Sequence, residues 1–220
     1  MNKKILLLLS IPKIIWFNLI HLPFRQAIKF PIALTYKTKV RVGGAILVND
    51  DVGLCMIRIG FHQVPVCNDN DRTSLIVEKG SVLEFCGSAH IGNGAKLHVA
   101  SKGHLTLGDN FAISASSAIN CYHHIVFGRD IQFSWNCLVM DSDTHRIYDR
   151  EGKLINKDQS VVLGDKIWIG CNCTILKGTI VPSNCVIGAN SLLVGDKFEE
   201  NSVIVGNPAK SFKKIGGWEL

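Results

Sequence analysis

The stretch from Leu163 to Phe198 decides the fold, and it reads LGDKIW, IGCNCT, ILKGTI, VPSNCV, IGANSL, LVGDKF when cut into hexads. A large aliphatic residue opens each hexad. A short strand of about five residues plus a corner makes one flat side, and three such sides close a triangular coil of about 18 residues. The stretch therefore predicts an all-β fold, a parallel β-helix, in which the aliphatic side chains stack inside successive coils.

The same period occurs earlier in the chain, starting at Ile91 and Leu97 and slipping by two residues at 125–126. The hexads form trios, each predicted to make one coil, at 107/113/119, 127/133/139, 163/169/175 and 181/187/193. Antiparallel strands in a β-sandwich are the alternative. Six consecutive matches at one fixed spacing, with glycine following three of the six aliphatic residues, disfavour that alternative.

A second, smaller residue four positions after the aliphatic one is also predicted to point into the coil. These positions hold Ala95, Ser101, Ser117, Cys137, Cys173, Thr179, Cys185 and Ser191. Three of the eight cysteines are thus expected to be small core residues, the commonest role of a free cysteine. Glycine directly follows the aliphatic residue at 92, 108, 128, 164, 170 and 188. There we expect corners that have no room for a Cβ atom or that need a positive φ.

A polar segment at residues 145–162, HRIYDREGKLINKDQSVV, breaks the period, and we expect it to protrude as a loop. A long loop within a solenoid usually serves a function. The β-helix domain is predicted to span residues 75–210, with a short tail at 211–220. Residues 1–74 form an extension before it, in which 36–75 are expected to be irregular strands.

The extension begins with an apolar run at residues 5–20, ILLLLSIPKIIWFNLI, which follows two lysines. Pro12 and Lys13 interrupt this run, which disfavours a transmembrane span or a signal peptide. We expect residues 1–35 to form one or two amphipathic helices that cover the end of the main domain or lie on a membrane surface. The expected location is the cytoplasm, with peripheral contact to the inner membrane face through residues 1–30.

The formal net charge of +6 suits an anionic ligand such as a phosphorylated cofactor, or an acidic membrane face. No basic run is interleaved with aromatic residues and no zinc-finger or RNP pattern is present, so nucleic acid is not an expected partner. The C-x-C pair of Cys171 and Cys173 lacks a second pair at zinc spacing, and no metal is expected.

Three motifs accompany the hexads: DSDTH at 141–145, KIWIG at 166–170 and VGNPAK at 205–210. With these motifs, residues 75–213 resemble the hexapeptide-repeat acyltransferases, in the branch of maltose, galactoside and serine acetyltransferases. Within that branch they most resemble the O-acetyltransferases of surface-polysaccharide biosynthesis. The resemblance implies a left-handed β-helix, acetyl-CoA as co-substrate, a saccharide hydroxyl as acceptor, and a homotrimer whose active site lies between subunits.

The resemblance also implies roles for individual residues. His145 matches the catalytic histidine, and Asn120 lies near an active-site asparagine of some relatives. The cofactor-binding positions it implies are Trp168, Gly170 and Cys171 at the turn lining the acetyl-CoA channel, Ala189 beside the pantetheine arm, and Lys210 and Lys213 near the phosphates. Val194 and Gly195 stand where some relatives have a Thr-Lys pair, and Lys197 is expected to substitute for that pair.

The chemistry of acetyl transfer to a hydroxyl supports a histidine base, because the pKa of histidine lies near working pH. A carboxylate or a carbonyl usually fixes the second nitrogen of such a histidine. Asp141 and Asp143 are candidates for this orienting role, although Asp143 falls on an inward hexad position; a backbone carbonyl is the alternative. The amide at the Gly170–Cys171 turn is the expected oxyanion donor.

Two further histidines and a tryptophan stand near these motifs. His123 falls on an inward hexad position and is expected to be structural, whereas His124 can line the acceptor cleft. Trp135, near the centre of its hexad, is expected to point out of the coil toward a sugar ring or a neighbouring subunit.

Other functions remain as alternatives. An N-acetyltransferase acting on an amino sugar is the nearest one. A zinc enzyme like the γ-carbonic anhydrases uses three histidines at a subunit interface, but the pair His123/His124 and the distant His145 do not give that spacing. A scaffolding solenoid has no need of DSDTH together with VGNPAK, and a nucleotidyltransferase needs a Gly-rich α/β domain that this chain lacks.

Overall fold

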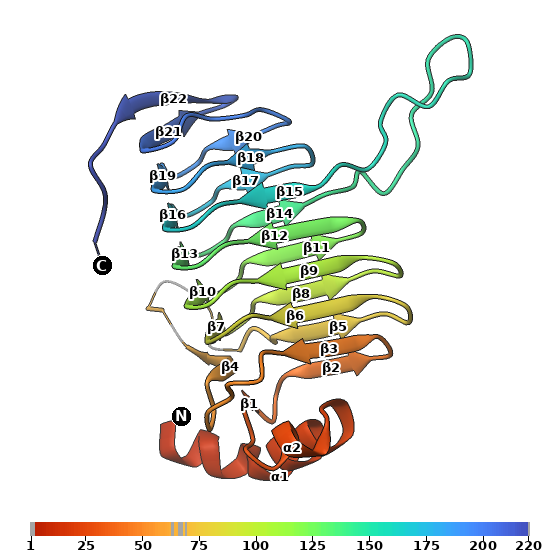
Figure 1. The fold of residues 1–220 in the computed structure, drawn as a ribbon, viewed down its shortest axis with the longest axis vertical. Helices are drawn as coiled ribbons and strands as arrows, with labels where there is room; N and C mark the ends of the chain where they lie inside the picture. Colours follow the sequence, from red (N-terminus) through yellow and green to blue (C-terminus); the bar gives the residue numbers. More distant parts are fainter. Residues whose placement is uncertain (1–2, 63, 66–67, 69, 220) are drawn as a thin grey trace.

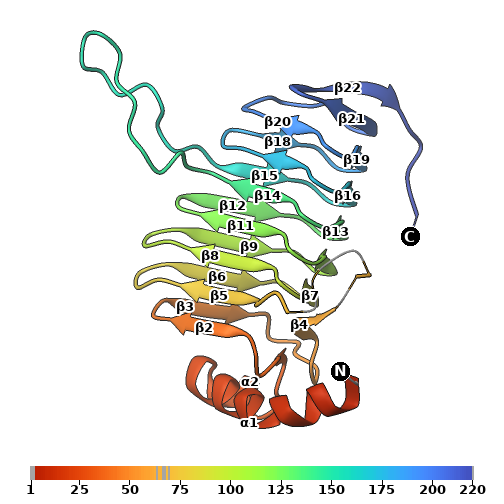
Figure 2. The same ribbon diagram turned by 180° about the vertical axis from the view of Figure 1, so that it is seen from behind.

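The computed structural model describes residues 3–62, 64–65, 68 and 70–219. The chain opens with helix α1 (Lys3–His21) and the short helix α2 (Phe24–Ala27), and the rest is built from short strands. Figure 1 shows these strands as one rising coil, with both helices at its base and a long loop projecting near its other end. Figure 2 shows the same arrangement from behind.

The strands of the described residues form three sheets, which are the three sides of the coil. Neighbours are parallel throughout, except for the final pair β21 and β22. Sheet A has the order β1 (Ile32–Leu34), β4 (Ile57–His62), β7 (Ala89–Gly92), β10 (Phe111–Ile113), β13 (Ile131–Phe133), β16 (Ile167–Ile169), β19 (Cys185–Ile187), β21 (Ser202–Gly206) and β22 (Ala209–Lys214). Sheet B has the order β2 (Lys39–Val42), β5 (Ser74–Val77), β8 (Lys96–Val99), β11 (Ala118–Cys121), β14 (Leu138–Met140), β17 (Thr174–Ile175) and β20 (Leu192–Leu193). Sheet C has the order β18 (Ile180–Val181), β15 (Val161–Leu163), β12 (His124–Phe127), β9 (His104–Leu107), β6 (Val82–Phe85) and β3 (Ala45–Val48).

The register of the ladders confirms the predicted trios. The trio Leu107, Ile113 and Ile119 has one member in each sheet, and its members pair with Phe127, Phe133 and Val139 of the next coil. These in turn pair with Leu163, Ile169 and Ile175. Because equivalent residues stack at one strand spacing, the aliphatic side chains form one continuous buried column along the coil axis.

The predicted small inward residues are buried, with one exception. Ser101 is exposed, so its inward assignment is wrong. The reason is the corner after β8, where residues 100–103 make a wider turn, with Lys102 at a φ of 71°. That turn directs Ser101 outward, and its N–H donates to the Glu78 carboxylate at 2.9 Å.

The corner glycines are required by close contact between coils, since none of the six predicted positions has a positive φ. A Cβ atom on Gly108 would lie 2.1 Å from the carbonyl oxygen of Gly128, and one on Gly170 would lie 2.6 Å from the Ala189 nitrogen. The positive φ falls two residues later instead, as at Asn110 with 55°. Asparagine tolerates this conformation better than most residues.

The coil begins well before residue 75. Strand β1 pairs in parallel with β4, β2 with β5, and β3 with β6. The prediction of irregular strands over residues 36–75 is therefore wrong, and β5 itself runs across residue 75. The sequence hid these coils because the connections β3–β4 and β4–β5 are long, which destroys the six-residue spacing.

Helix α1 covers the open end of the coil, as predicted for one of the two roles of residues 1–35 (Figure 1). It packs on β1 with Phe17 fully buried, and the helix continues through Pro12. By length and composition, the stretch Lys4–His21 is apolar enough to cross a membrane, and 28% of it is buried.

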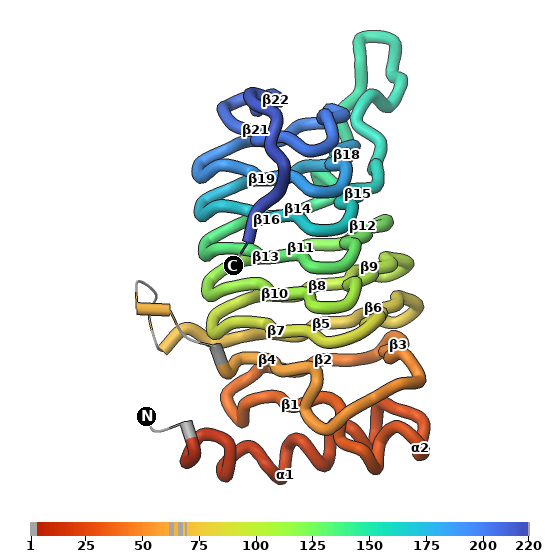
Figure 3. The backbone as a smooth tube through the Cα atoms, turned by 60° about the vertical axis from the view of Figure 1, so that its left-hand side comes forward, coloured from red at the N-terminus to blue at the C-terminus, as the bar shows by residue number. Residues whose placement is uncertain are grey.

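Two segments leave the coil. A loop protrudes between β14 and β15 where residues 145–162 were predicted to do so, but β15 already begins at Val161, so the predicted end is two residues too late (Figures 1 and 2). The tail after β22 turns back and crosses the outer face of sheet A (Figure 3). The Ile215 N–H donates to the Asn201 carbonyl at 2.9 Å, and the Trp218 indole donates to the Lys166 carbonyl at 2.9 Å.

Candidate active site

The DSDTH motif begins where strand β14 ends and the chain leaves the coil. Asp141 is fully buried there. One oxygen of its carboxylate accepts the Tyr122 N–H at 2.7 Å, and the other accepts the His123 N–H at 2.9 Å. Charge-assisted bonds of this kind are short and strong. Asp141 therefore ties the root of the loop to the preceding coil, and in the described part of the chain its carboxylate makes no hydrogen bond to the imidazole of His145.

His145 is exposed and lies at the root of the protruding loop. Its Nδ1 lies 3.1 Å from the Thr144 hydroxyl. When Nδ1–H donates to this hydroxyl, Nε2 keeps its lone pair, and Nε2 has no hydrogen bond to any residue the structure describes. The histidine lines a groove of about 460 Å³ between the loop and the coil. The other residues lining this groove are Tyr122, Ser142, Thr144, Arg146, Leu154, Asn156, Lys157 and Asp158.

Asn156 clamps the two arms of the loop together beside His145. Its side-chain N–H groups donate to the His145 carbonyl and to the Asp143 carboxylate, both at 2.8 Å. Its oxygen accepts the Ile147 N–H at 2.6 Å. Lys177 of the next coil bonds the same carboxylate and donates to the Asn156 carbonyl at 3.0 Å. The main chain of His145 is thus held through its carbonyl by Asn156, and Asp143, Ile147 and Lys177 hold Asn156 in turn.

Asp143 differs from its predicted position, since it is exposed and does not point into the coil. The chain leaves the coil at Asp141. The expectation that the residue four positions after a hexad aliphatic points inward therefore no longer applies at Asp143. The Lys177 ammonium, together with the Asn156 amide, holds the pKa of the Asp143 carboxyl below its usual range. Asp143 therefore acts on His145 through Asn156, and the two side chains share no hydrogen bond among the described residues.

Asn120 lies on the outer face of sheet B in a polar cluster. Its side-chain oxygen lies 2.6 Å from His98 Nδ1, and His98 Nε2 lies 3.2 Å from the Glu78 carboxylate. The Tyr122 ring packs edge-on against His98 at a centroid distance of 5.7 Å. Because Tyr122 also lines the His145 groove, it joins this cluster to the groove, although Asn120 itself does not line it.

The remaining histidines of this region lie on other faces. His123 is exposed, so the prediction that it points inward is wrong; Cys121 takes the inward place at the end of β11. His124 packs on His104 of sheet C at a ring distance of 5.3 Å and does not line the His145 groove. Burial, followed by the neighbouring His104, lowers the pKa of His124.

The corners between sheets A and B carry three of the seven residues predicted to bind the cofactor: Gly170, Cys171 and Ala189. Trp168 is 44% exposed on β16, and the Gly170–Cys171 corner follows it. The Cys171 N–H donates to no acceptor within the described part of the chain, whereas the carbonyl of Cys171 accepts the Asn190 N–H at 2.9 Å. Ala189 occupies the equivalent corner one coil further on, against Gly170. An unpaired amide at such a corner is available to a ligand.

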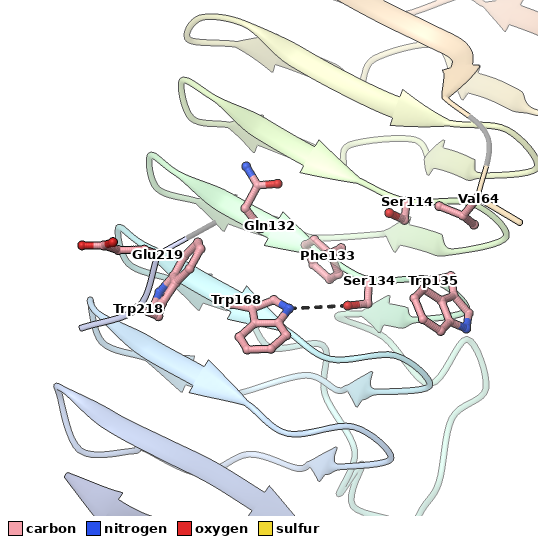
Figure 4. A pocket seen from close by; sticks show the side chains of 9 residues that line it. All are labelled: Val64, Ser114, Gln132, Phe133, Ser134, Trp135, Trp168, Trp218 and Glu219. Atoms are coloured by element: carbon pink, nitrogen blue, oxygen red, sulfur yellow. Dashed lines mark hydrogen bonds between the residues drawn. The ribbon is translucent and has the colours of Figure 1, made fainter. Parts of the chain in front are cut away.

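Trp135 points out of the coil, as predicted, with 36% of its surface exposed. Figure 4 shows it on one side of Trp168, with Trp218 from the tail on the other. The Trp168 indole N–H lies 3.5 Å from the Ser134 hydroxyl, and its ring centroid lies 6.5 Å from that of Trp218. Together they form an aromatic pocket of about 290 Å³ on the face of sheet A.

Sequence reasoning missed Trp218, Asn156 and Lys177. Trp218 contacts residues about fifty positions earlier in the chain, and nothing local to GGWEL indicates that contact. Asn156 was one of many polar residues in the loop. Lys177 follows a hexad aliphatic and looked like an ordinary surface lysine, a class of residue that is usually solvated.

The predicted phosphate-binding lysines fall in two places. Lys210 and Lys213 lie exposed on β22, in the hairpin that closes the far end of sheet A. Lys197 pairs with Ile180 of β18 and therefore lies on the sheet C side. The structure brings the first two together and keeps Lys197 apart from them.

Within one chain, His145 and Trp168 do not meet. His145 lies where the loop leaves the coil after sheet B, and Trp168 lies on sheet A beside the tail. The residues lining the His145 groove and those lining the Trp168 pocket share no member. Figures 1 and 2 show the loop and the tail on different sides of the coil. Among the described residues, no group of three or more His, Cys, Asp or Glu side chains is placed to hold a metal ion.

No family model matches the chain. Among curated proteins it is similar to WbbJ of Escherichia coli K12, named as an O-acetyl transferase of lipopolysaccharide biosynthesis, at 29% identity over 56% of this chain and 67% of that protein. It is also similar to a Mycobacterium tuberculosis protein named as an acetyltransferase, at 32% identity over 60% of this chain. The chain spans 44% of the length of that mycobacterial relative.

Solved structures establish the fold. The polysialic-acid-specific acetyltransferase NeuO superposes with a TM-score of 0.54 at 20% identity, covering 86% of this chain and 89% of that one. A galactoside acetyltransferase in complex with coenzyme A superposes with a TM-score of 0.50 at 21% identity, covering 58% of this chain and 62% of that one. Both are left-handed β-helices, which confirms the predicted fold class and its hand.

Proposed function

We infer that this chain, which belongs to the hexapeptide-repeat acyltransferases, is an acetyl-CoA-dependent O-acetyltransferase that modifies a saccharide hydroxyl. The observation that carries the proposal is the geometry of His145. Its carbonyl is held by Asn156, and its Nε2, which has no hydrogen-bond partner among the described residues, lies beside an open groove. The name of the Escherichia coli relative supports the reaction and the class of acceptor.

His145 supplies the base. As the acceptor oxygen attacks the thioester carbonyl carbon, Nε2 takes the hydroxyl proton, and the Thr144 hydroxyl keeps Nδ1–H oriented. The Cys171 N–H donates to the oxyanion that forms, a contact worth roughly 3 kcal/mol in comparable sites. When the carbon–sulfur bond breaks, the imidazolium returns its proton to the departing sulfur, giving an acetyl ester and free coenzyme A.

The sheet A–sheet B corners fit a coenzyme A arm. Their amides are ordered by the coil, and that of Cys171 is unpaired among the described residues. Lys210 and Lys213 project from the hairpin beyond these corners and carry the positive charge that phosphates need. The galactoside acetyltransferase that superposes on this chain holds coenzyme A.

The groove beside His145 suits a sugar. The Tyr122 ring offers an apolar face, and Arg146, Lys157 and Asp158 offer hydrogen-bonding groups at its rim. Such a mixture of one aromatic face and several polar side chains is what a polyhydroxylated ring requires.

A homotrimer completes the site in this proposal. His145 and Trp168 lie on different sides of one coil, so a base and a thioester channel can meet only when His145 of one subunit faces the Gly170–Cys171 corner of the next. A threefold ring repeats this contact at each interface.

The first experiment measures thiol release from acetyl-CoA with a panel of sugars and sugar nucleotides. We expect sugar-dependent release that falls by roughly 10²- to 10⁴-fold in His145→Ala. The matched control is His123→Ala, which removes an exposed imidazole near the same turn and keeps the backbone bond to Asp141. Hydroxylamine releases an acetyl ester but not an amide, so it separates O- from N-acetylation. Release that survives in His145→Ala would place the base elsewhere.

The second experiment tests the shared site. His145→Ala and Trp168→Ala are each expected to be inactive. When they are unfolded together and reassembled in equal amounts, about a quarter of the interfaces should combine an intact His145 with an intact Trp168. Recovery of about that fraction of wild-type activity is the expected result. No recovery, with mixed trimers demonstrated by mass spectrometry, would contradict a site between subunits.

A further inference from the structure

Helix α1 carries its polar side chains on the face that packs against the protein. Ser10 and Asn18 are fully buried. The Ser10 hydroxyl accepts the Tyr36 N–H at 3.0 Å. The Asn18 side chain donates to the Ile32 carbonyl at 2.7 Å and accepts the Ile32 N–H at 3.1 Å. The helix is therefore fastened to the first coil by polar contacts, the reverse of an ordinary surface helix.

The one charged residue in the middle of α1 also faces the protein. Lys13 lies between residues 5 and 20, a stretch with no other charge. Its ammonium donates to the Tyr36 carbonyl at 3.2 Å and to the Thr38 carbonyl. No lysine or carboxylate is thus left to solvate the outer face of this stretch.

The outer face of α1 is apolar from Ile5 to Ile20. The most exposed of its large side chains are Ile5, Leu8, Leu9, Trp16, Leu19 and Ile20, and α2 continues the surface with Phe24. Leu8 and Ile20 are 66% and 64% exposed. Contiguous apolar surface of this extent on a folded protein marks an interaction site.

The charge of the protein is concentrated at the same end. Residues 1–49 contain eight Lys and Arg residues and no Asp or Glu, so the remaining residues hold sixteen basic and eighteen acidic side chains. The whole positive excess therefore belongs to the helices and the first coil. Arg25 and Lys29 are exposed next to the exposed apolar residues Phe24 and Ile28, and Lys37 is exposed after β1. An apolar surface bordered by basic side chains matches an anionic lipid surface.

We propose that α1 and α2 dock the protein on the surface of an anionic phospholipid bilayer, with α1 in the plane of the membrane and its Leu8–Ile20 face inserted. A transmembrane orientation would break the bonds of Ser10, Lys13 and Asn18 to the first coil. Docking of a second copy on this face would bring two strongly basic ends together, and the electrostatic repulsion between them would grow as the salt concentration is lowered.

The docked orientation leaves the proposed site accessible. The helices lie at one end of the coil, and the His145 loop leaves near the other (Figure 1). Four strand spacings separate β2 from β14 in sheet B, about 19 Å in total. The membrane contact does not depend on the acetyl-transfer proposal, because it uses none of the residues near His145.

The test is sedimentation of the full chain with vesicles of phosphatidylcholine alone and of phosphatidylcholine mixed with phosphatidylglycerol. We expect binding to the anionic vesicles that weakens as salt is raised. Leu8→Gln combined with Ile20→Gln should weaken it by roughly tenfold or more. Arg25→Gln combined with Lys29→Gln should weaken it by roughly fivefold per residue, on anionic vesicles only. Circular dichroism confirms that each variant is folded.

The matched control is Ile155→Gln combined with Phe212→Gln, which removes side chains of similar exposure, 59% and 76%, away from the helices. This pair should bind vesicles like the wild type. Any one of four results would overturn the proposal. The first three are no binding to anionic vesicles, an equal loss of binding in the control pair, and release of the protein from membranes by detergent alone and never by alkaline carbonate. A changed oligomeric state in Leu8→Gln/Ile20→Gln with unchanged vesicle binding would also overturn it, because the face would then hold a second copy.

Discussion

Asp141 is the residue through which the coil fixes the DSDTH turn, and removing its carboxylate tests this account of the site. Its oxygens accept the Tyr122 and His123 N–H groups at 2.7 and 2.9 Å, and the residue is fully buried. A buried donor left without an acceptor costs about 1–3 kcal/mol. Asp141→Ala leaves two part-buried N–H donors without this acceptor and should therefore lower the free energy of unfolding by about 2–6 kcal/mol.

Two further variants calibrate this value. Asp141→Asn keeps one acceptor oxygen and turns an amide N–H₂ toward the other backbone donor, so it should cost about half as much as Asp141→Ala. Asp143→Asn, two residues later, removes an exposed carboxylate whose main partner is Lys177. Exposed ion pairs contribute about 0–1 kcal/mol, and this variant should cost no more.

The assay is urea unfolding followed by tryptophan fluorescence, at one fixed protein concentration because assembly adds to stability. Acetyl transfer measured on the same samples below the transition should fall in Asp141→Ala, since the root of the loop is released. The reasoning is refuted if Asp141→Ala stays within about 0.5 kcal/mol of the wild type, or if Asp143→Asn costs as much as Asp141→Ala.

Three further predictions follow from the coil and its corners. Gly108→Ala should lower the free energy of unfolding by about 3 kcal/mol or more, because its Cβ would lie 2.1 Å from the Gly128 carbonyl oxygen. Gly53→Ala, whose Cβ would have nothing within 4 Å, should leave thermal unfolding unchanged. Equal effects of the two variants would contradict the close packing of coils. Coenzyme A should slow alkylation of Cys171 and not of Cys55, measured by mass spectrometry; equal rates with and without coenzyme A would argue against a channel at that corner. Because burial lowers the pKa of His124, the folded state holds its proton more weakly than the unfolded state. The stability that this residue contributes is therefore complete above about pH 6.5 and is lost as pH falls through the folded pKa. His124→Gln should accordingly reduce the fall of the urea midpoint below about pH 6.5. An unchanged fall would refute the lowered pKa of His124.

The sequence alone determined the coil from residue 91 onward. The six-residue spacing of residues such as Leu107, Ile113 and Ile119 is local information, because each side of a coil needs the same short strand and corner. The inward cysteines and the corner glycines followed from that spacing. The spacing failed where insertions lengthen the connections, and the coils between Ile32 and Val77 were therefore not predicted.

The tertiary structure decided what surrounds His145. The motif DSDTH marked the position, but Asn156 and Lys177 reach it only after the loop folds back on the coil. Trp218 reaches Trp168 only because the tail recrosses sheet A. Such contacts join residues whose separation in sequence has no fixed period, so no pattern announces them.

Helix α1 shows the same division between what the sequence determined and what the tertiary structure decided. Its composition determined that residues 5–20 would be apolar and helical. It did not determine which side would face the protein, because apolar residues lie all round the helix and give no single stripe. Hydrogen bonds from Ser10, Lys13 and Asn18 to the first coil chose that side, since buried backbone groups at the end of a coil must find partners, and that choice left the leucines and isoleucines facing outward.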